Sequence, residues 1–134
     1  LLNKQRLNNR KLLLSRINYQ EDLNLQKKFH TAYTDLRYGI DGLATTVKEH
    51  FGLDPFSPRT IFLFCGRRND RIKALVWEGD GFLLLYKRLE AGKFKWPRNE
   101  SELRELTYEQ FDRLMRGFTI DPAIKKIRPP ESML

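Results

Sequence analysis

The sequence predicts an α+β domain: an antiparallel meander of four to five strands, one long helix packed across it, and a second, shorter C-terminal helix. Two observations lead to this prediction. Four apolar runs of strand length follow one another, and the short polar breaks between them carry glycine. On either side of these runs, apolar residues recur at helical spacing. The four runs span residues 61–65, 72–77, 82–86 and 94–96.

Alternation along the runs predicts two chemically different sheet faces. The second run places Ile72, Ala74 and Val76 on one side and Arg71, Lys73, Leu75 and Trp77 on the other. In the fourth run, Phe94 and Trp96 oppose Lys93 and Lys95 in the same way. We therefore expect one apolar face, covered by the long helix, and one basic face. The third run is apolar on both sides, which is typical of a central strand.

The domain is flanked by two basic segments. Residues 1–22 form an arm with leucines near helical spacing, and residues 121–134 form a basic, proline-containing tail. The part between them, residues 23–120, has the length of one domain. At its start, residues 23–29 alternate weakly and favour an edge strand.

The long helix is expected over residues 35–50. Thr34 is a suitable N-cap, and Asp35 would interact favourably with the helix dipole. Gly39 and Gly42 fall inside this helix, where glycine is unfavourable. Close packing against the sheet is the favoured explanation, and a phosphate site is the alternative.

The shorter helix is expected over residues 108–116. Thr107 and Gln110 have the spacing of a capping box, and Gly117 is placed to end the helix.

Composition restricts the class of protein. Hydrophobic residues make up 40% of the chain and aromatic residues 12%, as in globular domains, and no apolar run has the length of a membrane span. The single cysteine, Cys65, excludes an internal disulfide and fits the reducing cytoplasm. His30 and His50 lie too far apart in sequence for zinc-ligand spacing. We expect a cytoplasmic protein without metal or cofactor.

Residue types that could support catalysis do not form a constellation. Glu78 and Asp80 are the one acidic pair that could hold a cation in a nuclease, but both lie at expected turns, where carboxylates ordinarily cap amides. Cys65 lies in an apolar run and is expected to be a buried thiol. The glycines lack the lysine and hydroxyl that complete a P-loop. We expect that the protein is not an enzyme.

The net charge of +8 is unevenly distributed. Residues 1–33 carry seven Lys or Arg against two acidic residues, and residues 59–98 carry ten against four. Such segregation attracts a polyanion. The candidate nucleic-acid-binding residues are Arg67, Arg68, Arg71, Lys73, Lys87, Arg88, Lys93, Lys95 and Arg98. Trp77 or Trp96, if exposed, could stack on bases.

Three segments, residues 33–57, 61–98 and 106–118, closely resemble the accessory protein TnpB, encoded by the second open reading frame of insertion-sequence-66 transposons. Small departures from the family pattern are Ala32 before Tyr33 and Tyr38 before Gly39. The resemblance implies a small protein needed for bacterial transposition, encoded beside a larger protein that carries the acidic catalytic residues.

Resemblance and charge together predict a non-catalytic accessory protein that binds DNA, at transposon ends or target, through the basic sheet face and the arm. Its expected partners are DNA, the transposase and other proteins of the same transposon. The alternative is an assembly module that bridges these proteins without touching DNA, through a sheet edge or the arm.

Overall fold

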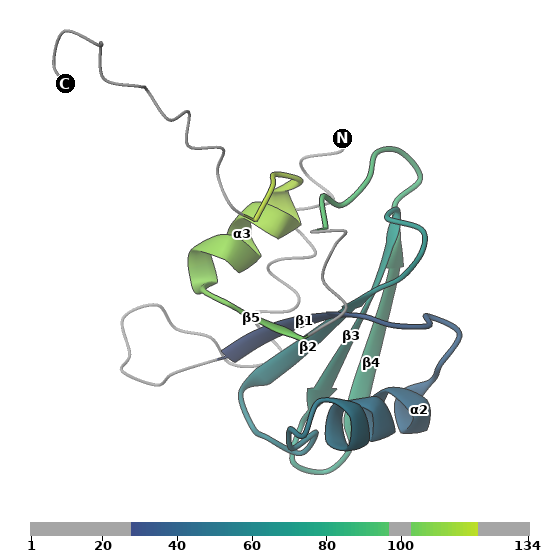
Figure 1. Cartoon of the computed structure of the whole chain (residues 1–134), viewed down its shortest axis with the longest axis vertical. Coiled ribbons are helices and arrows are strands. Elements are labelled where there is room, and N and C mark those ends of the chain that lie inside the picture. Colours follow the sequence, from purple (N-terminus) through teal and green to yellow (C-terminus); the bar gives the residue numbers. More distant parts are fainter. Residues whose placement is uncertain (1–27, 97–102, 121–134) are drawn as a thin grey trace, which may run out of the picture.

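The computed structural model describes residues 28–96 and 103–120 of the 134-residue chain. These residues form a five-stranded sheet with helical structure on both faces (Figure 1), which confirms the α+β class. The strands are β1 (Lys28–Tyr33), β2 (Thr60–Cys65), β3 (Arg71–Trp77), β4 (Phe82–Arg88) and β5 (Arg104–Leu106). The helices are α2 (Ile40–Thr45), which continues as the π-helical turn η1 (Thr46–His50), and α3 (Tyr108–Arg116).

The sheet is mixed, with the strand order β4-β3-β2-β1-β5. Strands β2, β3 and β4 form the expected antiparallel meander, but β1 runs parallel to β2 and antiparallel to β5. The prediction of a purely antiparallel sheet is therefore wrong in one pairing. Residues 34–59 carry α2 and η1 and provide the long crossover that a parallel pair requires. Of the edge strand expected over residues 23–29, residues 23–27 lie outside the described part, and β5 takes the edge beside β1.

The central strand is β2, in which all six residues are buried. The expectation that residues 82–86 form the central strand is wrong, because β4 lies at the sheet edge. The fourth expected strand, residues 94–96, is also absent. Instead, the Phe94 amide donates to the Asn69 carbonyl (2.7 Å), and the Leu89 amide donates to the Asp70 carbonyl (2.7 Å). These bonds turn the segment after β4 back over the β2–β3 loop.

Each sheet face has its own hydrophobic core. Ile72, Ala74 and Val76 share one core with the α3 residues Phe111, Leu114 and Met115, and with Phe29, whose ring stacks on Phe111 at a centroid separation of 4.3 Å. Leu75 lies in the second core, together with Leu43 of α2 and Val47 of η1. The helices thus lie on opposite faces, with α2 over the face expected to be basic. The predicted alternation is present, but this face is apolar at its centre and basic only toward one end.

The α2 helix begins at Ile40, five residues later than expected, and Gly39 is its N-cap without a side-chain capping bond. Asp35 instead accepts hydrogen bonds from Arg37 and forms a local turn that competes with the helix. A Cβ on Gly39 would contact nothing within 4 Å, and one on Gly42 would meet the Tyr38 side chain. Close packing against the sheet therefore does not explain either glycine.

The α3 helix has the expected bounds. The Thr107 side chain accepts from the Gln110 amide and the Gln110 side chain accepts from the Thr107 amide, so the capping box is confirmed. Gly117 ends the helix in the left-handed region, at φ 90°.

Candidate nucleic-acid interface

The parallel pairing of β1 and β2 brings two arginine-bearing loops to one end of the sheet. Tyr33 and Cys65 are register partners at the ends of their strands, and the Thr34 amide donates to the Cys65 carbonyl (2.8 Å). Parallel strands leave a sheet in the same direction. The loop that follows β1 and carries Arg37 therefore meets the loop that follows β2 and carries Arg67.

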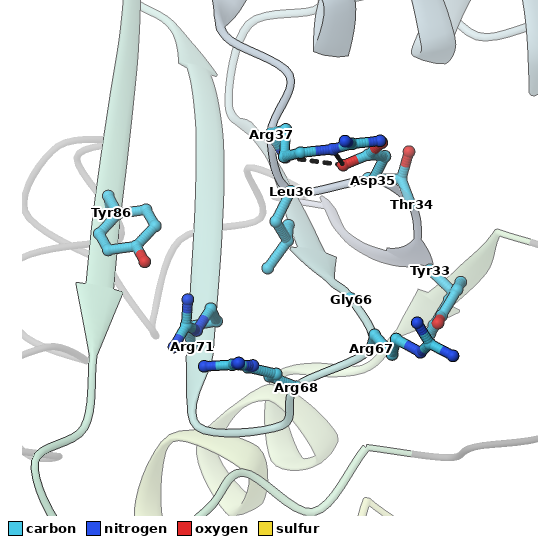
Figure 2. Close-up of a pocket in the computed structure, with 10 residues that line it drawn as sticks. All are labelled: Tyr33, Thr34, Asp35, Leu36, Arg37, Gly66, Arg67, Arg68, Arg71 and Tyr86. Atoms are coloured by element: carbon cyan, nitrogen blue, oxygen red, sulfur yellow. Dashed lines mark hydrogen bonds and ion pairs between the residues drawn. The ribbon is translucent and has the colours of Figure 1, made fainter.

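These loops enclose a pocket of about 640 Å³ (Figure 2). Its lining contains four arginines and a single acidic residue. The lining residues are Tyr33, Thr34, Asp35, Leu36, Arg37, Gly66, Arg67, Arg68, Arg71 and Tyr86. We call this the arginine pocket. It combines three of the nine predicted residues, Arg67, Arg68 and Arg71, with Arg37, which was not predicted.

Arg37 is held by Asp35. Its Nε and Nη2 donate to the two oxygens of the carboxylate, at 3.0 Å and 2.7 Å, respectively. These hydrogen bonds lower the pKa of Asp35 to about 2. The carboxylate is therefore ionised at any physiological pH, and the orientation of Arg37 does not depend on pH in that range.

Arg71 is held from the opposite side. Its Nε donates to Oδ1 of Asp70 at 3.0 Å, and its side chain is only 23% exposed. The hydrogen bond from Arg71 is the main cause of the lowered pKa of Asp70, and the charge of nearby Arg68 acts in the same direction. Arg71 is thus a recessed cation in a fixed orientation.

Arg67 and Arg68 differ from these two residues. Both are exposed in the loop that follows β2, and within residues 28–96 and 103–120 neither forms an ion pair with a carboxylate. A guanidinium without a protein partner retains its donors for an external anion. These two residues are the strongest candidates for contact with phosphate.

Gly66 permits the close approach of the two loops. A Cβ at this position would lie 2.9 Å from Cγ of Leu36 and 3.2 Å from the Thr34 carbonyl oxygen. No side chain larger than hydrogen fits here without movement of the loop that carries Arg37.

Two further predicted cations lie on the same sheet face but already interact with other groups of the protein. Lys73 donates through Nζ to the Tyr38 carbonyl (2.8 Å) and lies 5.5 Å from the Tyr86 ring centroid. Arg88 is the register partner of Arg71 and pairs with Glu90 at 3.2 Å.

The remaining predicted cations are separate from the pocket. Lys87 pairs with Ile72 in the register, so alternation places it on the α3 side of the sheet. Lys93 and Lys95 line a second pocket, together with Asn69 of the β2–β3 loop. Arg98 lies outside the described residues, as do the arm (1–22) and the tail (121–134). The cations therefore gather around one end of the sheet and its β2–β3 loop, and not over a whole face.

The tryptophans do not offer the expected stacking surface beside these cations. Trp96 is 8% exposed, and Trp77 packs against Phe56 and Phe82 at centroid separations of 4.9 Å each. The exposed aromatic residues of the arginine pocket are Tyr33 and Tyr86.

Other chemistry finds little support in the described part of the chain. There, no three His, Cys, Asp or Glu side chains are grouped as metal ligands. Glu78 and Asp80 are exposed in the β3–β4 turn, at the opposite end of β3 from Arg71. The buried Cys65 thiol, confirmed here, donates to the Ala32 carbonyl (3.5 Å). None of the described helices combines the length and apolar character of a membrane span.

A protein family described as "IS66 Orf2 like protein" (TnpB_IS66) matches residues 26–125. The chain belongs to this family. Membership confirms the resemblance noted above and associates the chain with insertion-sequence transposition as an accessory protein. The matched range includes every residue of the arginine pocket.

Two curated proteins of Sinorhizobium fredii are similar to the chain. The uncharacterized protein y4jC is 34% identical over 87 residues, which are 65% of this chain and 74% of y4jC. The uncharacterized protein y4hO is 33% identical over 94 residues, which are 70% of this chain and 81% of y4hO. No solved structure matches the chain significantly.

Proposed function

We propose that this family member is a non-catalytic accessory factor that binds DNA of the transposon or its target through the arginine pocket. One observation carries the proposal: Arg37, Arg67, Arg68 and Arg71 line one hollow, and two of them have no carboxylate partner among the described residues. Arginine binds phosphate in a bidentate manner, and contacts to the backbone supply most sequence-independent affinity for DNA.

The charge pattern around the pocket supports a long anion more than a small one. Lys93 and Lys95 line the second pocket on the far side of the β2–β3 loop. The Phe94–Asn69 backbone hydrogen bond ties that segment to the arginine loop. A strand of nucleic acid that crosses the loop would meet cations on both sides.

The test is a salt series on the double variant Arg67→Ala/Arg68→Ala. We expect weaker binding to duplex and single-stranded DNA. The slope of log K against log salt should become shallower by about 1.8 for the duplex and about 1.4 for the single strand, since each lost phosphate contact contributes about 0.9 or about 0.7, respectively. The matched control, Lys48→Ala/Arg59→Ala, removes two exposed cations that do not line the pocket. An unchanged slope in the pocket variant, or an equal change in the control, would refute the assignment.

Assembly with another transposon-encoded protein is the second candidate function, and β4 favours it. This strand lies at the sheet edge, and its first four residues, Phe82 to Leu85, are apolar and only half-buried. Edge strands of this kind recruit partner strands. Leu84→Lys should then abolish co-purification with the transposase and leave DNA affinity intact, whereas unaffected co-purification would argue against this edge.

A further inference from the structure

We infer that the arginine pocket takes an unpaired nucleotide of single-stranded DNA, with phosphate on the arginines and base on Tyr33 or Tyr86. The inference rests on the proposed function and specifies its ligand. Figure 2 shows the two tyrosines on opposite sides of the pocket, Tyr33 where β1 ends and Tyr86 on β4, with Arg68 and Arg71 between them.

Exposure of these rings is the first argument. Tyr33 is 48% exposed and Tyr86 is 52% exposed, although both line a concave site where an aromatic ring could have been buried. An exposed ring beside phosphate-binding cations is the arrangement on which single-stranded nucleic acids stack their bases.

The shape of the site is the second argument. Arg71 is recessed, and Asp70 holds its orientation. A volume of about 640 Å³ lies within the range of about 300 to 1,000 Å³ typical of small-ligand sites. The recessed Arg71 suits a group that enters the hollow. A duplex keeps its bases stacked inside and offers the pocket only its backbone.

The distribution of charge within the pocket is the third argument. Arg67 and Arg68, which lack carboxylate partners in the described part of the chain, occupy the loop between β2 and β3. Arg71 is recessed and paired with Asp70, so it contributes a fixed donor, whereas Arg37 is paired with Asp35 but is 90% exposed. Exposed cations can follow a flexible backbone while the fixed Arg71 positions a single nucleotide.

The experiment compares Tyr33→Leu/Tyr86→Leu with the unmodified full chain. Binding is measured by fluorescence anisotropy with labelled oligothymidylate and with the same strand annealed to oligodeoxyadenylate. We expect the variant to lose roughly tenfold or more in affinity for the single strand, the equivalent of one lost stacking contact. Its affinity for the duplex should change less than twofold.

Two further variants keep the result interpretable. Tyr33→Phe/Tyr86→Phe retains both rings and should bind the single strand nearly as the parent does. Tyr38→Leu removes a third tyrosine that is 45% exposed but does not line the pocket, and it should have no effect. Thermal unfolding of each variant verifies that the domain is folded.

The outcomes separate this inference from the proposed function. Equal losses for single strand and duplex, no loss for the single strand, or a parent chain that prefers duplex would overturn the unpaired-nucleotide site. The proposed function would survive each of these results provided that Arg67→Ala/Arg68→Ala still weakens DNA binding. If that arginine variant binds both forms normally, the proposed function itself fails.

Discussion

Leu36 lies directly against Gly66, and this contact joins the two loops of the arginine pocket. A Cβ on Gly66 would lie 2.9 Å from Leu36 Cγ, a distance that side chains do not tolerate without movement. The leucine follows β1 and the glycine follows β2, so the contact connects parts of the chain that are distant in sequence.

Gly66→Ala should destabilise the domain by about 1–3 kcal/mol through overpacking. It should also weaken DNA binding, because displacement of Leu36 moves the neighbouring Arg37. Chemical denaturation and a DNA titration measure the two effects. Gly81→Ala is the matched control, since a Cβ at Gly81 meets nothing within 4 Å. Normal stability and affinity in Gly66→Ala would show that the loops adapt.

Asp35→Asn should tighten DNA binding. The substitution removes the single acidic side chain from the lining of the arginine pocket, and surface charge interactions of this kind change affinity by roughly 1.5-fold to fivefold. Affinity is measured by DNA titration at low salt. Asp41→Asn, on the exposed side of α2, serves as the control. Weaker binding by Asp35→Asn would mean that the orientation of Arg37 outweighs the negative charge.

The stability of the domain should fall in mild acid because of His30. Burial lowers the pKa of His30, nearby Lys28 adds to this effect, and Glu105 opposes it. The unfolded chain therefore binds the proton more readily than the folded one. Stability is complete above the ordinary value of about 6.5 and declines as pH falls below it.

Denaturant unfolding at about pH 7.5 and pH 5.5 measures this decline. His30→Phe retains a ring to stack on Phe62, where the centroids lie 5.5 Å apart, and should show a smaller decline than the parent. His50→Asn alters an exposed histidine as the control. A decline of the same size in His30→Phe would assign the acid sensitivity to other groups.

Thr107→Ala should reduce stability by about 1 kcal/mol, the usual cost of a lost N-cap. The Thr107 hydroxyl accepts from the Gln110 amide at 3.1 Å, and α3 contributes three buried residues to one of the two cores. Thr45→Ala, at an exposed position without a side-chain capping bond, should change stability by less than about 0.5 kcal/mol. Equal values for the two variants in denaturant unfolding would contradict the role of the capping box.

Sequence-based predictions were accurate where the residues that determine a feature lie close together in the chain. The bounds of α3 were predictable because Thr107, Gln110 and Gly117 act within a few residues of one another. The start of α2 was not, because the local Asp35–Arg37 hydrogen bonds replace the first turn of the expected helix. The periodicity of apolar residues alone does not reveal this competition between a local turn and the helix.

Strand order depended on long-range pairing. Residues 61–65 and 82–86 are both continuous apolar runs, and the sequence does not show which of the two becomes central. Strand β2 becomes central because β1 pairs with it in parallel on the side away from β3. One of the two loops that form the arginine pocket also depends on this long-range pairing. Arg67, Arg68 and Arg71 share one hairpin and could be grouped from sequence, whereas Arg37 joins them only through the β1–β2 pairing.

That pairing also determines when the arginine pocket can form during folding. The β2–β3–β4 meander closes through short connections, whereas the β1–β2 pairing must close across residues 34–59, and pairing over such a sequence separation is the slower kind of event. A fragment that contains the meander alone would carry three of the four arginines and no enclosed hollow. Any recognition by this surface would thus require the completely folded domain, and a ligand bound there would in turn slow its unfolding.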